Sequence, residues 1–313
     1  MQGTVVAVHG HHFLVESGEG AEETRRAAPS VSSPPRGAAP TEGGSRGPCI
    51  FECVTRGKKG GVACGDHVRF ESTSSGKGVI EQIEPRRNLL YRSDEFKAKL
   101  IAANVDQAAI VVAAVPAFHE ELLIRCLVAC EVADIPALIV LNKADLPETE
   151  VLARKLAPYV DLGYPLLLVS AREDVSTLEQ RLAGHITVLV GASGVGKSTL
   201  LNRLVPEANA TTGEISLALD AGRHTTTHAR LFHLPDGGDL VDSPGMQEFG
   251  LKHLDLASLM AAFPEIHSRH GQCRFYNCRH LKEPGCAVLE AAKEGSILAS
   301  RLRVYHWLLA GIK

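Results

Sequence analysis

The chain has 313 residues, too many for one ordinary core, so two or three domains are expected. Hydrophobic residues make up 45% and charged residues 22%, a balance typical of soluble globular proteins, and no apolar run is long enough to span a bilayer. The formal net charge of -3 excludes a generally basic surface, so any contact with nucleic acid must come from local patches.

The first part of the chain, residues 1–85, contains short segments rich in Val, Ile and Phe that predict strands. Such strands favour a small β-barrel, either of the OB kind or of the SH3 kind. Residues 17–48 interrupt the pattern with a stretch of Pro, Gly, Ser and Ala that has little to bury. We expect a disordered insert there, without an activity of its own.

The eight cysteines are interpreted as thiols, because the N-terminal MQGTVVAVHG lacks the pattern of a secretory signal. We therefore expect a cytoplasmic protein. Five of the cysteines are expected to be small buried side chains: Cys49, Cys53, Cys64, Cys126 and Cys130.

From Gln107 the pattern changes to continuous apolar runs that alternate with helical segments, which predicts a parallel sheet covered on both faces. Strands are expected at 107–115, 136–142, 164–170 and 185–191, and helices at 120–134, 148–160 and 175–183. After Leu251 the pattern indicates short helices, followed by a long helical ending at 287–311.

The segment GASGVGKS at 191–198 fits the phosphate-loop pattern G-x-x-x-x-G-K-[ST], between a predicted strand and a predicted helix. Glycines let the backbone aim N–H groups at phosphate oxygens, and the helix adds its positive N-terminal end. Lys197 is expected at the β- and γ-phosphates and Ser198 at Mg²⁺. The expected nucleotide contacts are Gly191, Ala192, Ser193, Gly194, Val195, Gly196, Lys197, Ser198 and Thr199.

The segment DSPG at 242–245 ends a predicted strand. Asp242 is expected to hold Mg²⁺ through water, and Gly245 to let a backbone N–H approach the γ-phosphate. Upstream, AGRHTTTHARL is interpreted as a switch loop in which Thr226 or Thr227 closes over Mg²⁺. The sequence does not decide between these threonines, and a plain polar loop is the alternative.

Two segments that read the base follow successive predicted strands: NKAD at 142–145 and SAR at 170–172. Asp145 can accept hydrogen bonds from N1–H and the amino group of guanine, which adenine does not offer, so GTP is favoured over ATP. The stem of Lys143 is expected on the base plane, and Asn142 between the base loop and the phosphate loop. The N–H of Ala171, which follows Ser170, is expected at guanine O6.

The base-reading segments precede the phosphate loop, the reverse of the order in most GTP-binding proteins. A parallel sheet tolerates this because its carboxyl ends share one edge. With PRRNLLYR at 85–92, AANVDQ at 102–107, GRHTTTH at 222–228 and a Cys/His cluster after DSPG, the chain resembles the circularly permuted, ribosome small-subunit-dependent GTPase A (RsgA) family. The resemblance covers nearly the whole chain, apart from the insert.

The resemblance implies an α/β fold in three parts: an OB-like β-barrel at 1–85, a circularly permuted P-loop GTPase domain at 86–250 and a small α-helical zinc domain at 251–313. The implied activity is GTP hydrolysis, stimulated by the small ribosomal subunit during its late maturation. We expect a monomer with no membrane contact. A P-loop kinase or ATPase, and a GTP-regulated RNA-binding translation factor, are the alternatives.

Cys273, Cys278, His280 and Cys286 follow the pattern C-x4-C-x-H-x5-C. Three thiolates and an imidazole are expected to hold one structural Zn²⁺ with no open position. Buried or free thiols are the alternative reading. His267 and His270 could compete as ligands but fit the spacing less well.

Cations and aromatic residues surround the predicted zinc ligands, a combination that can pair phosphates and stack on bases of rRNA. These residues are Arg269, Arg274, Phe275, Tyr276, Arg279 and Lys282. The basic loop TRGKKGG at 55–61 adds a second such region on the barrel. Solvated surface charge is the alternative.

Met246 stands where many GTPases place a water-orienting glutamine. Because a thioether cannot orient water, slow unaided hydrolysis is expected. His224, in the candidate switch, is the candidate catalytic residue and would position the attacking water once the ribosome orders that loop.

Overall fold

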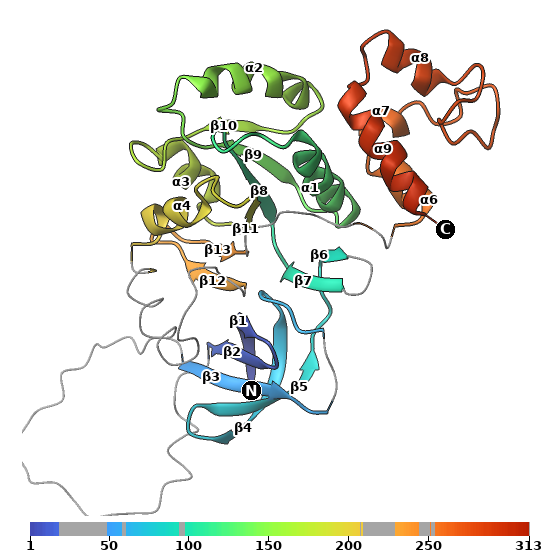
Figure 1. Ribbon diagram of the computed structural model, residues 1–313. Helices are drawn as coiled ribbons and strands as arrows, with labels where there is room; N and C mark the ends of the chain where they lie inside the picture. Colours follow the sequence, from blue (N-terminus) through green and yellow to red (C-terminus); the bar gives the residue numbers. More distant parts are fainter. Residues whose placement is uncertain are drawn as a thin grey trace, which may run out of the picture. The chain divides into compact units, whose positions relative to one another are not determined.

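The computed structural model describes residues 1–18, 49–57, 61–93, 98–206, 208, 229–243, 251 and 254–312 (Figure 1). The chain divides into two compact units, Met1–Arg86 and Arg87–Lys313. The further division of the second unit into a nucleotide domain and a zinc domain stays a prediction. Within the described ranges, none of the helices has the length and apolar character needed to cross a membrane.

The first unit is a closed five-stranded barrel. Its strands are β1 (Gln2–His9), β2 (His12–Ser17), β3 (Cys49–Thr55), β4 (His67–Ser74) and β5 (Lys77–Ile83). They follow the order β1-β2-β3-β5-β4, and β4 pairs back with β1. The pair β3–β5 is parallel and the others are antiparallel. This is the OB arrangement, which decides between the two expected barrels.

Apolar and polar residues alternate along the strands, so that the apolar side chains fill the interior of the barrel. On β3, Phe51 and Cys53 are buried while their neighbours face outward, as the period of two in a strand requires. The rings of Phe51 and Phe70 pack with centroids 5.1 Å apart. The insert expected at 17–48 begins too early, because Ser17 is the buried last residue of β2, and residues 19–48 are outside the described part of the chain.

Two successive arginines, the last residue of the first unit and the first residue of the second, bind different carboxylates. Arg86 pairs with the buried Asp66 in the barrel, Nε to Oδ1 at 2.6 Å. Arg87 donates to Asp106 Oδ1 in the second unit at 2.8 Å. Asp106 Oδ2 in turn accepts from the N–H of Ile186, where the phosphate-loop strand begins. The PRRN segment is thus anchored on both sides of the unit boundary.

The second unit contains a six-stranded sheet. Its strands are β8 (Gln107–Val112), β9 (Ala137–Leu141), β10 (Leu166–Leu168), β11 (Ile186–Gly191), β12 (Arg230–His233) and β13 (Asp239–Asp242). In the order β10-β9-β8-β11-β13 all pairs are parallel, which confirms the predicted sheet. The antiparallel strand β12, which pairs with β13, was not predicted, because four residues show too little periodicity.

Helices cover both faces of this sheet (Figure 1). They are α1 (Glu120–Val132), α2 (Glu148–Asp161), α3 (Ser176–Leu182) and α4 (Lys197–Leu204). Ala109 and Val111 of β8 face the core shared with α3 and α4, and Ile110 and Val112 face α1. A hairpin of β6 (Leu89–Ser93) and β7 (Ala98–Ala103), which was not predicted, precedes the sheet.

The C-terminal part of the second unit consists of short helices. These are α6 (Leu256–Ala261), α7 (Pro264–His267), α8 (Ala287–Lys293) and α9 (Ala299–Gly311). The prediction of one long helix at 287–311 is wrong, because this segment forms two helices, α8 and α9. Gly295 takes a left-handed φ of 82°, and Ser296 N–H returns to Ala291 O at 2.9 Å, which ends α8.

A buried arginine joins α9 to its surroundings. Arg301 is fully buried and pairs with Glu265 of α7, with Nη2 and Oε2 3.1 Å apart. Its guanidinium carbon lies 5.0 Å from the Phe263 ring and about 6 Å from the rings of Tyr159 and Tyr164. Losing one partner of the buried Arg301–Glu265 pair costs about 3–5 kcal/mol.

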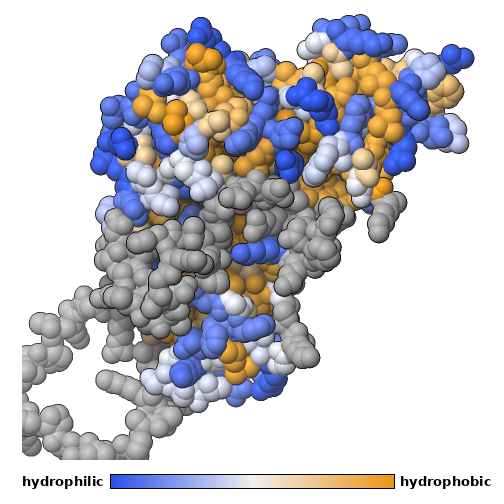
Figure 2. Space-filling view, viewed as in Figure 1, coloured by the Kyte–Doolittle hydropathy of each residue, from blue (hydrophilic) through white to orange (hydrophobic). Residues whose placement is uncertain are grey.

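Apolar surface remains visible over α9 in Figure 2, bordered by hydrophilic residues over α8.

Candidate functional site

The carboxyl ends of the five parallel strands meet at one edge of the sheet. After β8, β9 and β10 come Val115–Pro116, the NKAD loop and the SAR turn, and after β11 comes the phosphate loop. Asp242 is the last residue of β13 and lies opposite Leu189 of β11. The segments that were expected to bind base, phosphate and Mg²⁺ therefore lie side by side despite their order in the chain.

Two phosphate-loop glycines have no room for a side chain. Gly191 has a φ of 149°, and a Cβ on it would overlap the carbonyl oxygen of Val111 on the neighbouring strand. Gly196 has a φ of 99°, and a Cβ on it would overlap Asn142 Nδ2. The second overlap shows that the base loop comes into direct contact with the phosphate loop just before α4.

The Lys197 ammonium is held inside the phosphate loop. Nζ donates to Gly191 O at 2.9 Å and to Ala192 O at 2.7 Å. An ammonium has three donors, so one remains for a phosphate oxygen. Burial lowers the pKa of Lys197, and burial raises the pKa of Asp242 to about 6 against the opposing effect of the lysine charge. The two buried groups, Lys197 at the start of α4 and Asp242 at the end of β13, thus influence each other's charge across the site.

Asn142 connects the three loops of the site. Its Nδ2 donates to Val195 O of the phosphate loop at 2.9 Å, and its Oδ1 accepts from Ala171 N–H at 3.1 Å. The side chain is buried. The predicted link between the base loop and the phosphate loop is present, with the SAR turn as a third member. Because Ala171 N–H is already paired, guanine O6 would have to share that donor or displace Asn142.

Lys143 makes a second link between the loops. With a left-handed φ of 64°, it directs Nζ to Gly194 O at 3.0 Å and to Val115 O at 2.6 Å. Pro116 also packs beside Gly194. The contribution of the Val115–Pro116 segment could not be predicted from the sequence, because it is a backbone carbonyl and carries no side-chain chemistry.

Asp145 lines a pocket of about 260 Å³. The walls of this pocket are Asn142, Lys143, Asp145, Leu146, Ala171, Arg172, Gly194, Gly196 and Thr199. Ser170 donates to Asp145 Oδ1 at 2.6 Å, and this bond holds the pKa of Asp145 below its ordinary value. One pocket is thus lined by the ionised carboxylate that was predicted to read the base and by the phosphate loop. Ser193 and Ser198 are exposed on that loop.

Four of the expected site residues lie outside the described part of the chain: His224, Thr226, Thr227 and Gly245. Met246 lies outside it as well. Their roles stay predictions.

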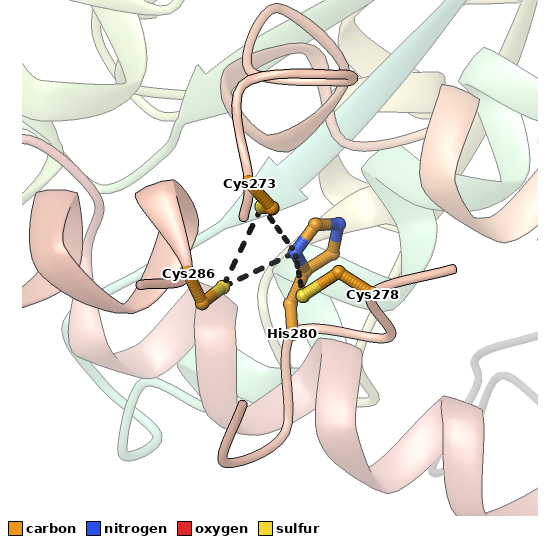
Figure 3. Close-up of side chains that lie close together, drawn as sticks. All are labelled: Cys273, Cys278, His280 and Cys286. Atoms are coloured by element: carbon orange, nitrogen blue, oxygen red, sulfur yellow. Dashed lines mark hydrogen bonds between the residues drawn. The ribbon is translucent and has the colours of Figure 1, made fainter. Parts of the chain in front are cut away.

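A second site is formed by Cys273, Cys278, His280 and Cys286, whose ligand atoms all lie within 4.8 Å of one another. Figure 3 shows the four side chains pointing toward one another, with Cys286 at the start of α8. His280 Nδ1 lies 3.6, 3.5 and 3.3 Å from the three sulfurs in chain order, and Cys273 and Cys286 are 3.8 Å apart.

These separations fit a tetrahedral zinc ion. Zn–S bonds of about 2.3 Å and a Zn–N bond of about 2.0 Å place sulfurs about 3.8 Å apart and sulfur and nitrogen about 3.5 Å apart. The cluster can therefore hold a metal ion. His267 and His270, the competing candidates, are exposed and do not belong to it.

Surrounding groups fix the loop that carries the cluster. His280 has a left-handed φ of 61°, and its carbonyl pairs with His306 Nε2 of α9 at 2.6 Å. Glu283 accepts from three backbone N–H groups between Arg279 and Lys282. These bonds outweigh the desolvation of the carboxyl and lower its pKa to about 2. The ionised Glu283 carboxylate thereby fixes the turn, and the bond to His306 holds the loop against α9.

A doubly covered parallel sheet, a phosphate loop and a guanine-type base loop that comes earlier in the chain define a circularly permuted P-loop GTPase. The family model of the RsgA GTPase matches residues 83–252. "Small ribosomal subunit biogenesis GTPase RsgA" of Burkholderia pseudomallei is 50% identical over 98% of this chain and 91% of its own length. The protein of that name from Nitrosospira multiformis is 47% identical over 100% of this chain and 91% of its own.

Solved structures that are similar to this chain support the same family assignment. YjeQ from Thermotoga maritima superposes with a TM-score of 0.67 at 28% identity, over 98% of this chain and 96% of its own. YloQ, described as a circularly permuted GTPase, gives 0.65 at 26% identity over 99% and 94%. The chain therefore belongs to the RsgA GTPase family.

Proposed function

We propose that this GTPase acts in the biogenesis of the small ribosomal subunit, as a late maturation and checkpoint factor whose hydrolysis of GTP is stimulated by that subunit. The names of the relatives from Burkholderia pseudomallei and Nitrosospira multiformis support this assignment. The observation that carries the nucleotide chemistry is Asn142, whose buried amide joins the base loop to the phosphate loop. We further propose that the protein works in the cytoplasm as a monomer.

In this proposal the pocket holds GTP with its base at Asp145 and its phosphates on the loop from Gly191 to Thr199. Asp145 accepts the two guanine donors, and the stem of Lys143 covers the base. Backbone N–H groups of the loop and Lys197 neutralise the phosphates. Ser198 and Asp242 supply the oxygen ligands that Mg²⁺ prefers, together with Thr226 or Thr227 and the backbone at Gly245. Mg²⁺ neutralises charge on the β- and γ-phosphates.

Hydrolysis in this proposal depends on a group from the ribosome-ordered switch. Met246 cannot orient water, so the isolated protein hydrolyses GTP slowly. His224 positions the attacking water once the switch is ordered on the subunit.

The Cys273–Cys286 cluster holds one structural Zn²⁺ in this proposal, and the loop it stabilises contacts rRNA. The fully exposed Tyr276 and the half-exposed Phe275 support such contacts, because exposed aromatic rings can stack on unpaired bases. Arg274, Arg279 and Lys282 are exposed beside them and can pair with phosphates.

GTP turnover measured with purified small subunits, large subunits and free rRNA tests the proposal. Stimulation by small subunits alone is expected, and binding to them should weaken steeply as salt rises. Equal stimulation by free rRNA would instead favour a GTP-regulated RNA-binding translation factor. Turnover of ATP in competition with GTP would favour the kinase or ATPase reading.

A further inference from the structure

The imidazole of His280 lacks the outer partner that usually orients a metal-binding histidine. Such a histidine normally donates the N–H of its second ring nitrogen to a carboxylate or a carbonyl, which fixes the plane of the ring. His280 turns Nδ1 toward the three sulfurs, and its Nε2 points away from them and is buried (Figure 3). Among the residues that the structure describes, none pairs with Nε2. The direction of the ring therefore depends on its packing against Tyr305 and on the backbone that carries it.

The backbone of His280 is held in a conformation that needs support. Its φ of 61° lies in the left-handed region, which residues other than glycine adopt rarely and at a cost in energy. His306 Nε2 on α9 lies 2.6 Å from the carbonyl oxygen of His280 and donates to it. This bond holds the peptide that follows His280 through its carbonyl group.

Glu283 holds the same stretch of backbone through its N–H groups. Oε1 accepts from Arg279 N–H at 2.9 Å, and Oε2 accepts from Leu281 N–H at 2.8 Å and from Lys282 N–H at 3.0 Å. Hydrogen bonds to an ionised acceptor are stronger than those between neutral groups. Because these donors stand before and after His280 in the chain, one carboxylate binds the backbone on both sides of the histidine.

Two of the cysteines are supported by a different hydrogen bond. Arg274 N–H donates to Gly285 O at 3.0 Å, which ties the residue after Cys273 to the residue before Cys286. Glu283 takes no part in this bond. The contacts of Glu283 therefore act mainly on the histidine.

We propose that Glu283 is a positioning residue of the metal site, which aims His280 Nδ1 at the ion by binding the backbone on both sides of that histidine. A rotation of the peptides beside His280 would move Nδ1, because the side chain turns with its Cα. The inference rests on the proposed zinc site and goes beyond it, since Glu283 contributes no ligand atom. The carboxylate takes over the task that a hydrogen bond at the second ring nitrogen performs in most zinc sites.

The zinc affinity of the full-length protein, measured in competition with a chromophoric chelator, tests this role. Glu283→Gln keeps the size of the side chain, but its amide NH₂ group meets at least one backbone N–H donor whichever way it is turned. The affinity for zinc should fall about 10-fold, as is typical when an outer partner of a ligand is lost. Glu290→Gln is the matched control and should bind zinc as the wild type does. It removes the same charge one helical turn after Cys286, from an exposed position on α8.

Substitution of zinc by Co²⁺ shows which ligand has moved. Glu283→Gln should keep the charge-transfer absorption from thiolate to Co²⁺, because the cysteines remain bound. Its d–d bands should shift, because they respond to the geometry of the ion and the histidine is displaced. A general weakening of the loop would instead reduce both kinds of absorption together.

Zinc affinity in Glu283→Gln equal to that of the wild type would overturn the proposal, as would an equal loss in Glu290→Gln. Charge-transfer and d–d absorption that weaken in proportion would also overturn it, because Glu283 would then support the loop as a whole. If Glu283→Gln does not fold, Glu283→Asp carries the test. This variant keeps the charge on a shorter stem that cannot reach all three donors, and wild-type affinity in it would have the same meaning.

The wild type separates this failure from failure of the metal site itself. If the wild type binds zinc and Glu283→Gln binds it equally well, only the role of Glu283 is lost. A wild type that binds neither zinc nor Co²⁺ would show that the proposed metal site is wrong, and the role of Glu283 with it.

Discussion

Ser300 of α9 donates a hydrogen bond to Glu120 of α1 at 2.9 Å, although 180 positions separate them in the chain. The same carboxylate accepts from Tyr159 at 3.0 Å and pairs with Lys155 at 2.9 Å, both on α2. Glu120 therefore joins two helices of the nucleotide-binding sheet to the C-terminal helix. Any movement of α9 away from the sheet has to break the hydrogen bond from Ser300 to this carboxylate.

Replacing Glu120 by Gln should destabilise the protein in a pH-dependent way. Burial alone would raise the pKa of Glu120, but hydrogen bonds from Lys155, Ser300 and Tyr159 hold it below its ordinary value of 4.5. A carboxyl with a lowered pKa stabilises the fold fully above its ordinary pKa, and this contribution is lost as the pH falls through the folded-state pKa. At pH 7 the variant should lose about 1–3 kcal/mol in the free energy of unfolding. The deficit should shrink below about pH 4.5.

Urea unfolding of both proteins across this pH range measures the difference. Glu121→Gln is the control, because Glu121 is the next residue of α1 but is exposed, and its carboxylate lies 3.7 Å from Arg125 Nη2. A deficit that stayed the same at all pH values, or that Glu121→Gln reproduced, would contradict the role given to Glu120.

Removing the amide of Asn142 should weaken nucleotide binding strongly, because this one side chain pairs with two buried backbone groups. Asn142→Ala leaves the Val195 carbonyl and the Ala171 N–H without partners, and each unpaired buried group costs about 1–3 kcal/mol. We expect GDP affinity to fall about 10- to 100-fold, measured by titration calorimetry. Asn202→Ala, on the exposed side of α4, is the matched control. Unchanged affinity in Asn142→Ala would show that the loops hold their positions without it.

The metal cluster predicts one zinc ion per chain. Cys278→Ser should lose that ion and lower the free energy of unfolding by about 4 kcal/mol or more, because the ion would join the four side chains of the loop and its binding adds to the stability of the fold. Elemental analysis and thermal melting measure the two effects. Cys49→Ser on β3, a half-buried thiol in the barrel, should keep the zinc. A zinc content that did not change in Cys278→Ser would rule out the four-residue ligand set.

His224 is expected to matter only on the ribosome. His224→Ala should lower turnover stimulated by small subunits about 100-fold and leave the slow unaided turnover and GDP binding unchanged. His228→Ala, in the same segment, is the control. A neutral effect of His224→Ala on stimulated turnover would remove this histidine from the mechanism.

Local patterns were enough to predict much of the fold and the centre of the site. The strand from Gln107 is apolar throughout because both of its faces are covered, and the loop that ends at Lys197 has a spacing that few other functions require. The four residues that were predicted as zinc ligands from their spacing lie together in a cluster that could hold a metal ion. These features depend on neighbours in the chain, where the sequence carries the signal.

The features that were missed depend on partners far away in the chain. The hydrogen bond from Lys143 to Val115 O involves a carbonyl that any residue would supply. The burial of Arg301 could not be read from an amphipathic pattern, since a charge at that position normally indicates a solvent-facing side. The break at Gly295 was missed because a single glycine is tolerated inside many helices.

Trp307 gives this protein an optical probe of its own. It is the single tryptophan of the chain and is 55% exposed on α9, with the guanidinium of Arg125 on α1 lying 4.9 Å from its ring. Indole emission responds to polarity and to a nearby charge, so the unlabelled chain carries a fluorophore at the contact between these two helices. The kinetics of that contact can therefore be followed in stopped flow without attaching a dye.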